Sequence, residues 1–306
     1  MTETAPPPSR RLTPGSPAGQ VVLAYLREQA AALDRLDPGV RRDQPDAVHQ
    51  MRVATRRLRS TLRTFRRVIG PAGDLDDELR WLAGVLGEAR DAEVLAGHLE
   101  SALRAVPKEE LIGPVQARIK VHFAPVAAQA REGVLEALDS RRYGSLRDRV
   151  GKLIAGPLRP ARAGGPAGEV LPAEVRRAYR TTARRMERAR QAPPGPARDT
   201  ALHQARKAAK RARYAGELAR PAIGRKAERF TRQVKEVQTL LGDHHDAVIA
   251  RQRERSLGIE AHLSGENAFT YGLLYERESE AADKLGARAF KAWKKASRPR
   301  FRRWMS

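Results

Sequence analysis

Residues 48–69 read VHQMRVATRRLRSTLRTFRRVI, and two helical patterns overlap in this stretch. One set of mostly apolar positions advances by steps of three and four residues, which predicts a helix with one buried face: Val48, Met51, Thr55, Leu58, Leu62, Phe65 and Ile69. A second set, displaced by one residue, is basic: His49, Arg52, Arg56, Arg59, Arg63 and Arg66. One residue corresponds to about 100° on a helix, so we expect the basic stripe to lie beside the buried face.

The basic stripe contains no compensating acid. Neither Asp nor Glu occurs from Ala47 to Gly73. Like charges three or four residues apart cost about 0.2–0.5 kcal/mol per pair, so an exposed helix face usually mixes both signs. On this segment alone, the alternative interpretation is an ordinary solvated face in an arginine-rich protein.

The stretch recurs in the second half of the chain. Aligned without gaps, residues 46–70 and 200–224 are identical at 10 of 25 positions, and His49 falls on His203. Arg56 falls on Lys210, which keeps the charge, whereas Glu217 takes the position of Arg63 and shortens the second stripe. A Leu-Gly-x-x-x-Asp motif follows each copy, at residues 86–91 and 241–246. Two ordered blocks that recur after about 155 residues predict an internal duplication.

The composition narrows the classes of partner. The 306 residues include 59 Lys and Arg against 36 Asp and Glu, a formal net charge of +23. Such a charge attracts polyanions, and the candidates are nucleic acid, an anionic membrane surface and inorganic polyphosphate. The absence of cysteine excludes disulfides, thiolate metal sites and cysteine nucleophiles. Without an apolar run of about 20 residues or a signal-peptide pattern, we expect a soluble cytoplasmic protein with no transmembrane segment.

We predict an all-α fold of two pseudo-symmetric helical bundles, because no segment shows sustained strand alternation. The expected organisation is a disordered tail (1–17), a duplicated domain (18–289, with halves 18–154 and 173–289 and a Gly/Pro-rich linker 155–172) and a basic aromatic tail (290–306). Local signals predict three interruptions of helices: a stop at Asp37-Pro38-Gly39, a point at Gly87 where the helix can break, and a helix start after Gly242.

Both copies contain the motif His-x-x-Arg-x-x-x-Arg-Arg-x-Arg, with Lys210 replacing one arginine in the second copy. With this doubled motif, the chain resembles the CHAD family (conserved histidine α-helical domain) from about Ala18 to Ala289. The resemblance implies two four-helix bundles around a basic groove that binds inorganic polyphosphate without catalysis, cofactor or metal. It implies these ligands: His49, Arg52, Arg56, Arg57, Arg59, Arg63, His203, Arg206, Lys207, Lys210, Arg211 and Arg213, with Arg90 and Lys235 near the groove. The chain lacks the Glu-x-Glu-x-Lys motif of fused triphosphate tunnel domains, which implies the stand-alone form associated with polyphosphate granules and their proteins.

These residue types suit polyphosphate, a flexible anionic chain without bases to stack or sequence to read. Arginine offers a planar fork that can bind phosphate oxygens in pairs. Neighbouring stripe residues lie about 5–6 Å apart, within reach of neighbouring phosphates. A protonated histidine adds charge, so we expect the pKa of His49 and His203 to rise when polyphosphate binds.

Two other functions fit parts of the sequence. The run His244-His245-Asp246 resembles the metal ligands of HD-type phosphohydrolases, so a metal-dependent phosphohydrolase would use His49, His203, His245 and Asp246. A non-specific nucleic-acid binder is the third hypothesis, although an aromatic content of 5% argues mildly against stacking on single strands. The Lys/Arg/Trp-rich C-terminus could contact nucleic acid or an anionic membrane.

Overall fold

The computed structural model describes residues 11–306, which form α-helices and two 3₁₀ turns with one isolated bridge between Pro17 and Pro166. The prediction of an all-α fold is therefore confirmed. No helix within the described residues combines the length and hydropathy that crossing a membrane requires.

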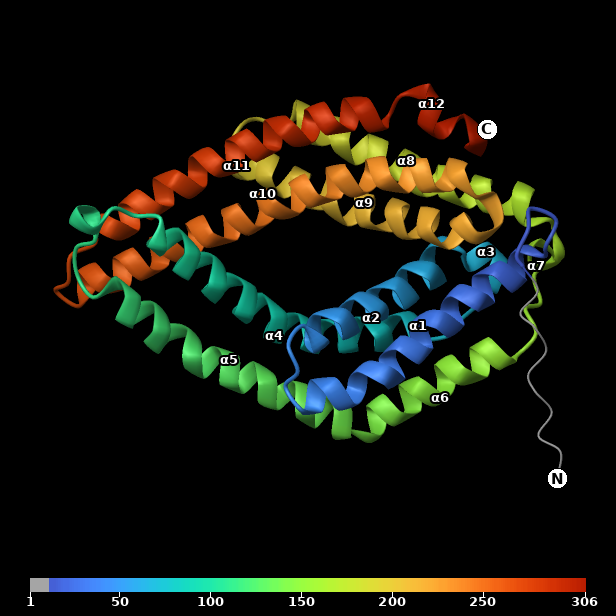
Figure 1. Cartoon of the computed structure of the whole chain (residues 1–306), viewed down its shortest axis with the longest axis horizontal. Helices are drawn as coiled ribbons and strands as arrows, with labels where there is room; N and C mark the ends of the chain where they lie inside the picture. The colour runs from blue at the N-terminus through green and yellow to red at the C-terminus, as the bar shows by residue number, and fades with distance from the viewer. Residues whose placement is uncertain (1–10) are drawn as a thin grey trace.

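The first half contains four long helices, each packed against the next in chain order (Figure 1): α1 (Ala18–Arg41), α2 (Ala47–Thr64), α4 (Leu75–Arg104) and α5 (Val115–Asp139). Four smaller elements complete it: α3 (Arg66–Ile69), η1 (Lys108–Glu110), α6 (Arg141–Ala155) and α7 (Ala161–Gly164). α6 packs against α1, α4 and α5, so it closes the lower side of this bundle.

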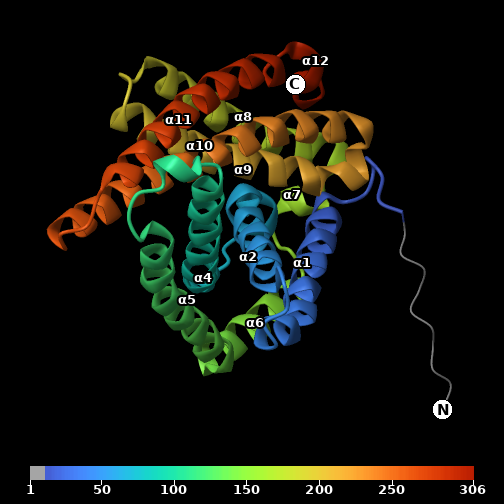
Figure 2. The ribbon, with the colours of Figure 1, turned by 60° about the vertical axis from the view of Figure 1, so that its left-hand side comes forward.

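The second half packs its helices in the same order: α8 (Ala167–Gln191), α9 (Pro196–Ile223), α10 (Arg225–Leu263) and α11 (Phe269–Ala296). The short elements α12 (Pro299–Arg302) and η2 (Arg303–Met305) fold back on α10 and α8. Figure 2 shows this half lying across the first, with α2 and α9 close to each other. The two helices that carry the repeated motif therefore pack against each other between the halves.

The apolar face predicted for residues 48–69 is buried at every position except Val48, which is half-buried. It belongs to a hydrophobic core that runs through both halves. A second cluster joins the distant ends of α4, α5, α10 and α11, around Leu99, Phe123, Leu257 and Tyr271. The halves are thus held together by apolar packing at two places.

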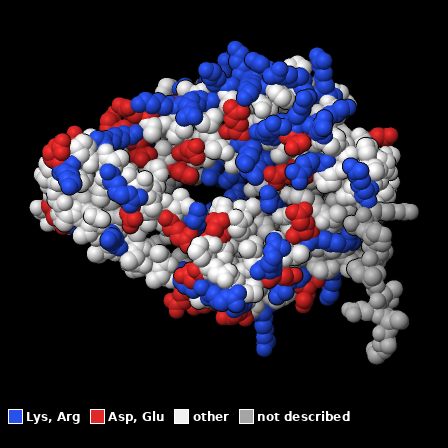
Figure 3. All heavy atoms as spheres, in the orientation of Figure 1, with Lys and Arg blue, Asp and Glu red and all other residues white. Residues whose placement is uncertain are grey.

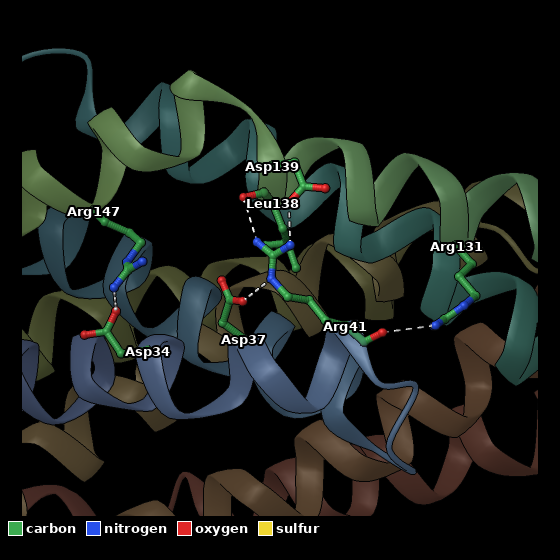
Figure 4. A network of polar contacts seen from close by, with 7 residues as sticks. All are labelled: Asp34, Asp37, Arg41, Arg131, Leu138, Asp139 and Arg147. Carbon is green, nitrogen blue, oxygen red and sulfur yellow. Dashed lines mark hydrogen bonds and ion pairs between the residues drawn. The ribbon is translucent and has the colours of Figure 1, made fainter.

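Three predicted interruptions are wrong, because the helices continue through them. α1 runs past Pro38 and Gly39 to Arg41. Arg41 stabilises this last turn (Figure 4). It binds Asp37 within α1, and it binds Asp139 and the carbonyl of Leu138 on α5. α4 passes through Gly87 and α10 through Gly242. Glycine in a helix costs about 1 kcal/mol relative to alanine, which packing along such long helices offsets.

Segments expected to be a linker and tails also contain ordered structure. α8 begins at Ala167, inside the expected linker. Near the C-terminus, the ring of Trp293 stacks on that of Tyr179 with centroids 5.5 Å apart. At the other end, the carbonyl of Pro14 accepts a hydrogen bond of 2.7 Å from the amide of Gly168. Residues 1–10 of the expected disordered tail lie outside the described residues.

Candidate functional site

A cavity of about 830 Å³ lies between α2 and α9, with further walls from α4, α8 and α10. Figure 3 shows an opening between the two halves with Lys and Arg side chains at its edge. The described residues that line the cavity include ten Lys and Arg and only two carboxylates. The cations are Arg52, Arg56, Arg59, Arg63, Arg80, Arg185, Arg206, Lys207, Lys210 and Arg211, and the acids are Asp91 and Asp246.

The local fold explains why the stripe of α2 faces the cavity. The apolar face of α2 is anchored in the core, with Met51 and Leu58 buried. The basic stripe is turned by about 100° from that face. Arg52, Arg56 and Arg59 therefore emerge at the edge of the core and line the cavity.

The stripe of α9 forms the facing wall. Leu202, Ala205 and Ala209 anchor this helix in the core. The wall residues follow one position later and at neighbouring turns: His203, Arg206, Lys207, Lys210 and Arg211. Of the fourteen predicted ligands, nine line this single cavity, four from α2 and five from α9.

The Leu-Gly-x-x-x-Asp motif holds one arginine in each half. The guanidinium of Arg52 lies 3.5 Å from the position that a Cβ at Gly87 would occupy, and its Nη1 donates to Asp91 at 2.9 Å. In the second half, Nε of Arg206 lies 3.8 Å from the corresponding Cβ position at Gly242. Arg206 also forms an ion pair with Asp246 at 3.8 Å. The glycine gives the arginine room against the helix, and the aspartate one turn later orients it.

Five predicted ligands do not line the cavity: His49, Arg57, Arg90, Arg213 and Lys235. Arg57 and Arg213 both bind the carboxylate of Glu217, at 3.2 and 2.7 Å, and so fasten α2 to α9. Arg90 pairs with Glu93 at 3.1 Å, and Lys235 is exposed on α10.

His49 lies just outside the cavity. Its Nδ1 atom is buried without a hydrogen-bond partner within the described residues. Burial lowers the pKa of His49, and the charge of Arg90 lowers it further. His49 is thus placed to be affected by charge in the site without forming its wall.

Several wall residues were not among the predicted ligands. Arg80 on α4 and Arg185 on α8 lie outside the repeated motifs, so only the tertiary fold brings them to the cavity. His245 takes the position of Arg90 in the repeat. Because Arg90 was a predicted ligand, this alignment could have predicted that His245 lies at the cavity.

Burial and the neighbouring cations lower the pKa of several groups. Burial, followed by the charges of Arg56 and Arg206, lowers the pKa of Lys210 to about 6. Burial also lowers the pKa of His203 to about 4 and that of His245 to about 3. The Nδ1 atoms of these two histidines lie 3.1 Å apart. Burial and the surrounding positive charge thus disfavour added protons in the cavity, whereas the positive charge would attract an anion.

The run His244-His245-Asp246 does not converge on one point. His244 is buried and pairs with Asp199 at 3.3 Å, outside the cavity wall. His245 faces His203, and Asp246 faces Arg206. Within residues 11–306, no group of three or more His, Asp or Glu residues is arranged to hold a metal ion.

Charge is distributed unequally over the whole chain. Residues 1–172 contain 27 Lys and Arg and 21 Asp and Glu, whereas residues 173–306 contain 32 and 15. The last 23 residues, 284–306, contain nine basic residues and no acid. Figure 3 shows the resulting concentration of Lys and Arg over the half formed by α8–α12.

Comparison with protein families identifies the fold. The family model described as the CHAD domain matches residues 24–255. The chain belongs to the CHAD domain family. Two curated Mycobacterium tuberculosis proteins, named uncharacterized proteins MT2285 and Rv2226, are each 38% identical over 277 residues. The match covers 89% of this CHAD protein and 52% of each relative, so the chain spans about half the length of these relatives.

Solved structures show the same fold. PptA from Streptomyces chartreusis superposes with a TM-score of 0.73 at 22% identity, covering 91% of this chain and 100% of that one. The CHAD domain from the plant Ricinus communis gives 0.66 at 24% identity, covering 99% and 97%. At these identities the similarity establishes the CHAD fold alone.

Proposed function

We propose that this CHAD domain binds inorganic polyphosphate in the cavity between α2 and α9 and does not catalyse its hydrolysis. The observation that carries the proposal is the imbalance of charge around one cavity, with ten Lys and Arg against two carboxylates. Such a site is destabilised by mutual repulsion when empty and gains most from a ligand that is densely anionic. The nine predicted ligands in the wall are proposed to bind phosphate oxygens.

The form of the cavity favours a thin, flexible anion. Polyphosphate can enter a confined space between helices, whereas a nucleic-acid duplex would have to bind across its opening. Tyr214 is the one Phe, Tyr or Trp among the described residues of the wall, and it is mostly buried. A site for single-stranded nucleic acid usually offers several aromatic rings on which bases stack. The lining therefore supports polyphosphate over single-stranded DNA or RNA.

The proposed binding also gives a simple basis for association with polyphosphate granules. Chains at a granule surface would enter the cavity, and the protein would stay with them. Granule proteins are then candidate partners by proximity, and their contacts would lie on surfaces outside the cavity.

The test is a titration with long-chain polyphosphate at physiological salt. The double variant Arg52→Glu/Arg206→Glu places negative charge on both walls, and we expect its affinity to fall at least about 100-fold. The matched control is Arg35→Glu/Arg42→Glu, which changes the same charge at exposed positions on α1 and its C-terminal cap, outside the cavity. An equal loss in both variants would show attraction by net charge alone and would refute the site.

Two further measurements separate the alternative functions. A phosphate-release assay with added divalent metals tests the phosphohydrolase, and release that depends on His203 and His245 would overturn the non-catalytic proposal. In a competition experiment, polyphosphate is expected to displace DNA at salt concentrations where DNA does not displace polyphosphate. The opposite order would favour a nucleic-acid binder.

A further inference from the structure

A second basic cavity of about 750 Å³ lies at the end of the stripe of α2. Its walls come from the end of α2, from α3, from the loop of residues 70–73 and from α8. It contains five arginines: Arg63, Arg66, Arg67, Arg177 and Arg211. Neither the sequence pattern nor the family resemblance assigned a role to this place as a separate groove.

The two cavities are adjacent because they share wall residues. Arg63 from α2 and Arg211 from α9 line both of them. Charge is concentrated at this junction, since burial and then the charges of Arg63, Arg185 and Arg59 lower the pKa of Arg211. A chain that occupies the central cavity thus meets cations on both sides where it would leave.

The acids of the second cavity are already paired. Asp76 binds Arg59 at 3.2 Å and also contacts Arg80. Glu174 is fully buried and accepts a hydrogen bond from Arg177. In contrast, Arg66 and Arg67 are exposed, and neither forms an ion pair with an acid of the described residues. The second cavity therefore presents free guanidinium groups to an incoming anion.

We propose that this second cavity extends the polyphosphate site, so that one chain fills the central cavity, passes between Arg63 and Arg211, and lies along Arg66 and Arg67. The inference rests on the proposed function. At 1.5 Å per residue, the stripe from Arg52 to Arg63 spans roughly 16 Å, and α3 continues the cations beyond it. The extended site selects for length: a chain long enough to reach both cavities binds more tightly than one that fills the first alone.

The gain has a clear physical origin. Once one part of a chain is bound in the central cavity, the next part is held near Arg66 and Arg67 at a high effective concentration. Its binding to the second cavity then costs little further translational entropy. A short oligophosphate lacks this second segment and gains nothing from it.

The test compares tripolyphosphate with long-chain polyphosphate on the variant Arg66→Glu/Arg67→Glu. We expect long-chain affinity to fall at least about tenfold more than tripolyphosphate affinity. The slope of log K against log salt concentration for long-chain binding is expected to become less steep by about one to two. The control Arg35→Glu/Arg42→Glu carries the same charge change and is expected to affect the two probes alike. The neutral pair Arg66→Gln/Arg67→Gln repeats the test with less perturbation of α3. Its effect is expected to be smaller, and again larger for long-chain polyphosphate than for tripolyphosphate.

The outcomes separate this inference from the proposed function. If Arg66→Glu/Arg67→Glu weakens both probes by the same factor, or neither, while Arg52→Glu/Arg206→Glu abolishes binding, the extension is wrong and the central site stands. If the wild-type protein binds neither probe, the proposed function itself fails.

Discussion

The two walls of the cavity share a sequence pattern, yet they differ in chemistry. The cations of the α2 wall are all arginines, whereas α9 adds two lysines and a histidine to its two arginines. Lys210 replaces Arg56, and Glu217 replaces Arg63. Arginine stays protonated in any protein environment, but lysine and histidine can lose their protons. The first wall therefore has fixed charge, and the second has charge that adjusts to the contents of the cavity.

The walls also differ in which of the aligned arginines line the cavity. Arg59 lines the cavity, but its counterpart Arg213 is held by Glu217. Conversely, Arg211 lines the cavity, but its counterpart Arg57 binds Glu217. Equivalent positions in a gap-free alignment thus have exchanged roles. A repeated motif fixes which face of a helix is basic, but tertiary packing decides which of its residues reach the ligand.

The largest effect is expected where the two walls face each other. Arg56→Glu and Lys210→Glu each place a negative charge inside the cavity, and we expect each to lower polyphosphate affinity about 30- to 1,000-fold at low salt. Binding is measured by fluorescence anisotropy with a labelled chain. A loss of less than threefold in either variant would mean that this wall does not contact the ligand.

A smaller loss of affinity with a gain in stability is expected for Lys210→Met. Because burial holds the pKa of Lys210 near 6, the charged form is strained in the free protein. Its replacement by an apolar side chain of similar length is expected to stabilise the free protein by about 1–3 kcal/mol and to weaken binding about tenfold. Thermal unfolding with and without polyphosphate measures both.

The matched control for this variant is Lys207→Met on the same helix. Lys207 is exposed, so its replacement is expected to change stability by less than about 0.5 kcal/mol. If Lys210→Met destabilised the free protein, the strain attributed to this buried cation would be absent.

The adjustable wall predicts a dependence on pH. The pKa values of His203 and His245 are lowered to about 4 and 3, so between pH 6.5 and these values the unfolded chain binds protons that the folded protein does not. The free protein therefore loses stability as the pH falls through this range. Bound phosphate raises these pKa values, so we expect affinity to increase about 3- to 10-fold from pH 7.5 to 5.5.

Calorimetry in two buffers with different ionisation enthalpies measures the protons taken up on binding. Uptake is expected at pH 7, largely by Lys210, and His203→Gln/His245→Gln is expected to flatten the dependence below pH 6.5. Net proton release from the wild-type protein would contradict the account of the second wall.

The smallest effect on binding is expected at the aligned position where the two halves carry side chains of opposite charge. Glu217→Gln removes the carboxylate shared by Arg57 and Arg213, so we expect a loss of about 1–2 kcal/mol in stability and less than a twofold change in affinity. Arg63→Gln, at the equivalent position of α2, is expected to do the opposite: little change in stability and a 3- to 10-fold loss of affinity. If the two variants changed stability and affinity alike, the assignment of Glu217 as a structural residue and Arg63 as a ligand-binding residue would be wrong.

Local periodicity predicted much of this molecule. The spacing of Met51, Leu58 and Phe65 predicted the buried face of the first striped helix, and the repeat predicted its partner. Gly70 follows the last residue of α3 and Gly224 the last residue of α9, and both adopt positive φ angles (89° and 71°) that favour glycine.

The misplaced ligands required information that no local pattern holds. Arg57 was expected in the site because of the resemblance, although it lies outside the periodic stripe of residues 49, 52, 56, 59 and 63. Its partner Glu217 is 160 residues away in sequence. Arg80 and Arg185 enter the wall from positions outside the repeated motifs. In each case the deciding contact forms only when the halves pack together.

The unequal distribution of charge gives the protein an electric dipole moment in addition to its net charge. In the field of any densely anionic surface the molecule turns, so that the half formed by α8–α12 points towards that surface and the less positive half of α1–α6 points away. The two ends of the molecule thus meet different surroundings: one lies in the counterion layer, the other faces bulk solvent. A fluorophore attached to α5 would remain accessible to a quencher in solution, whereas one attached to α12 would be shielded.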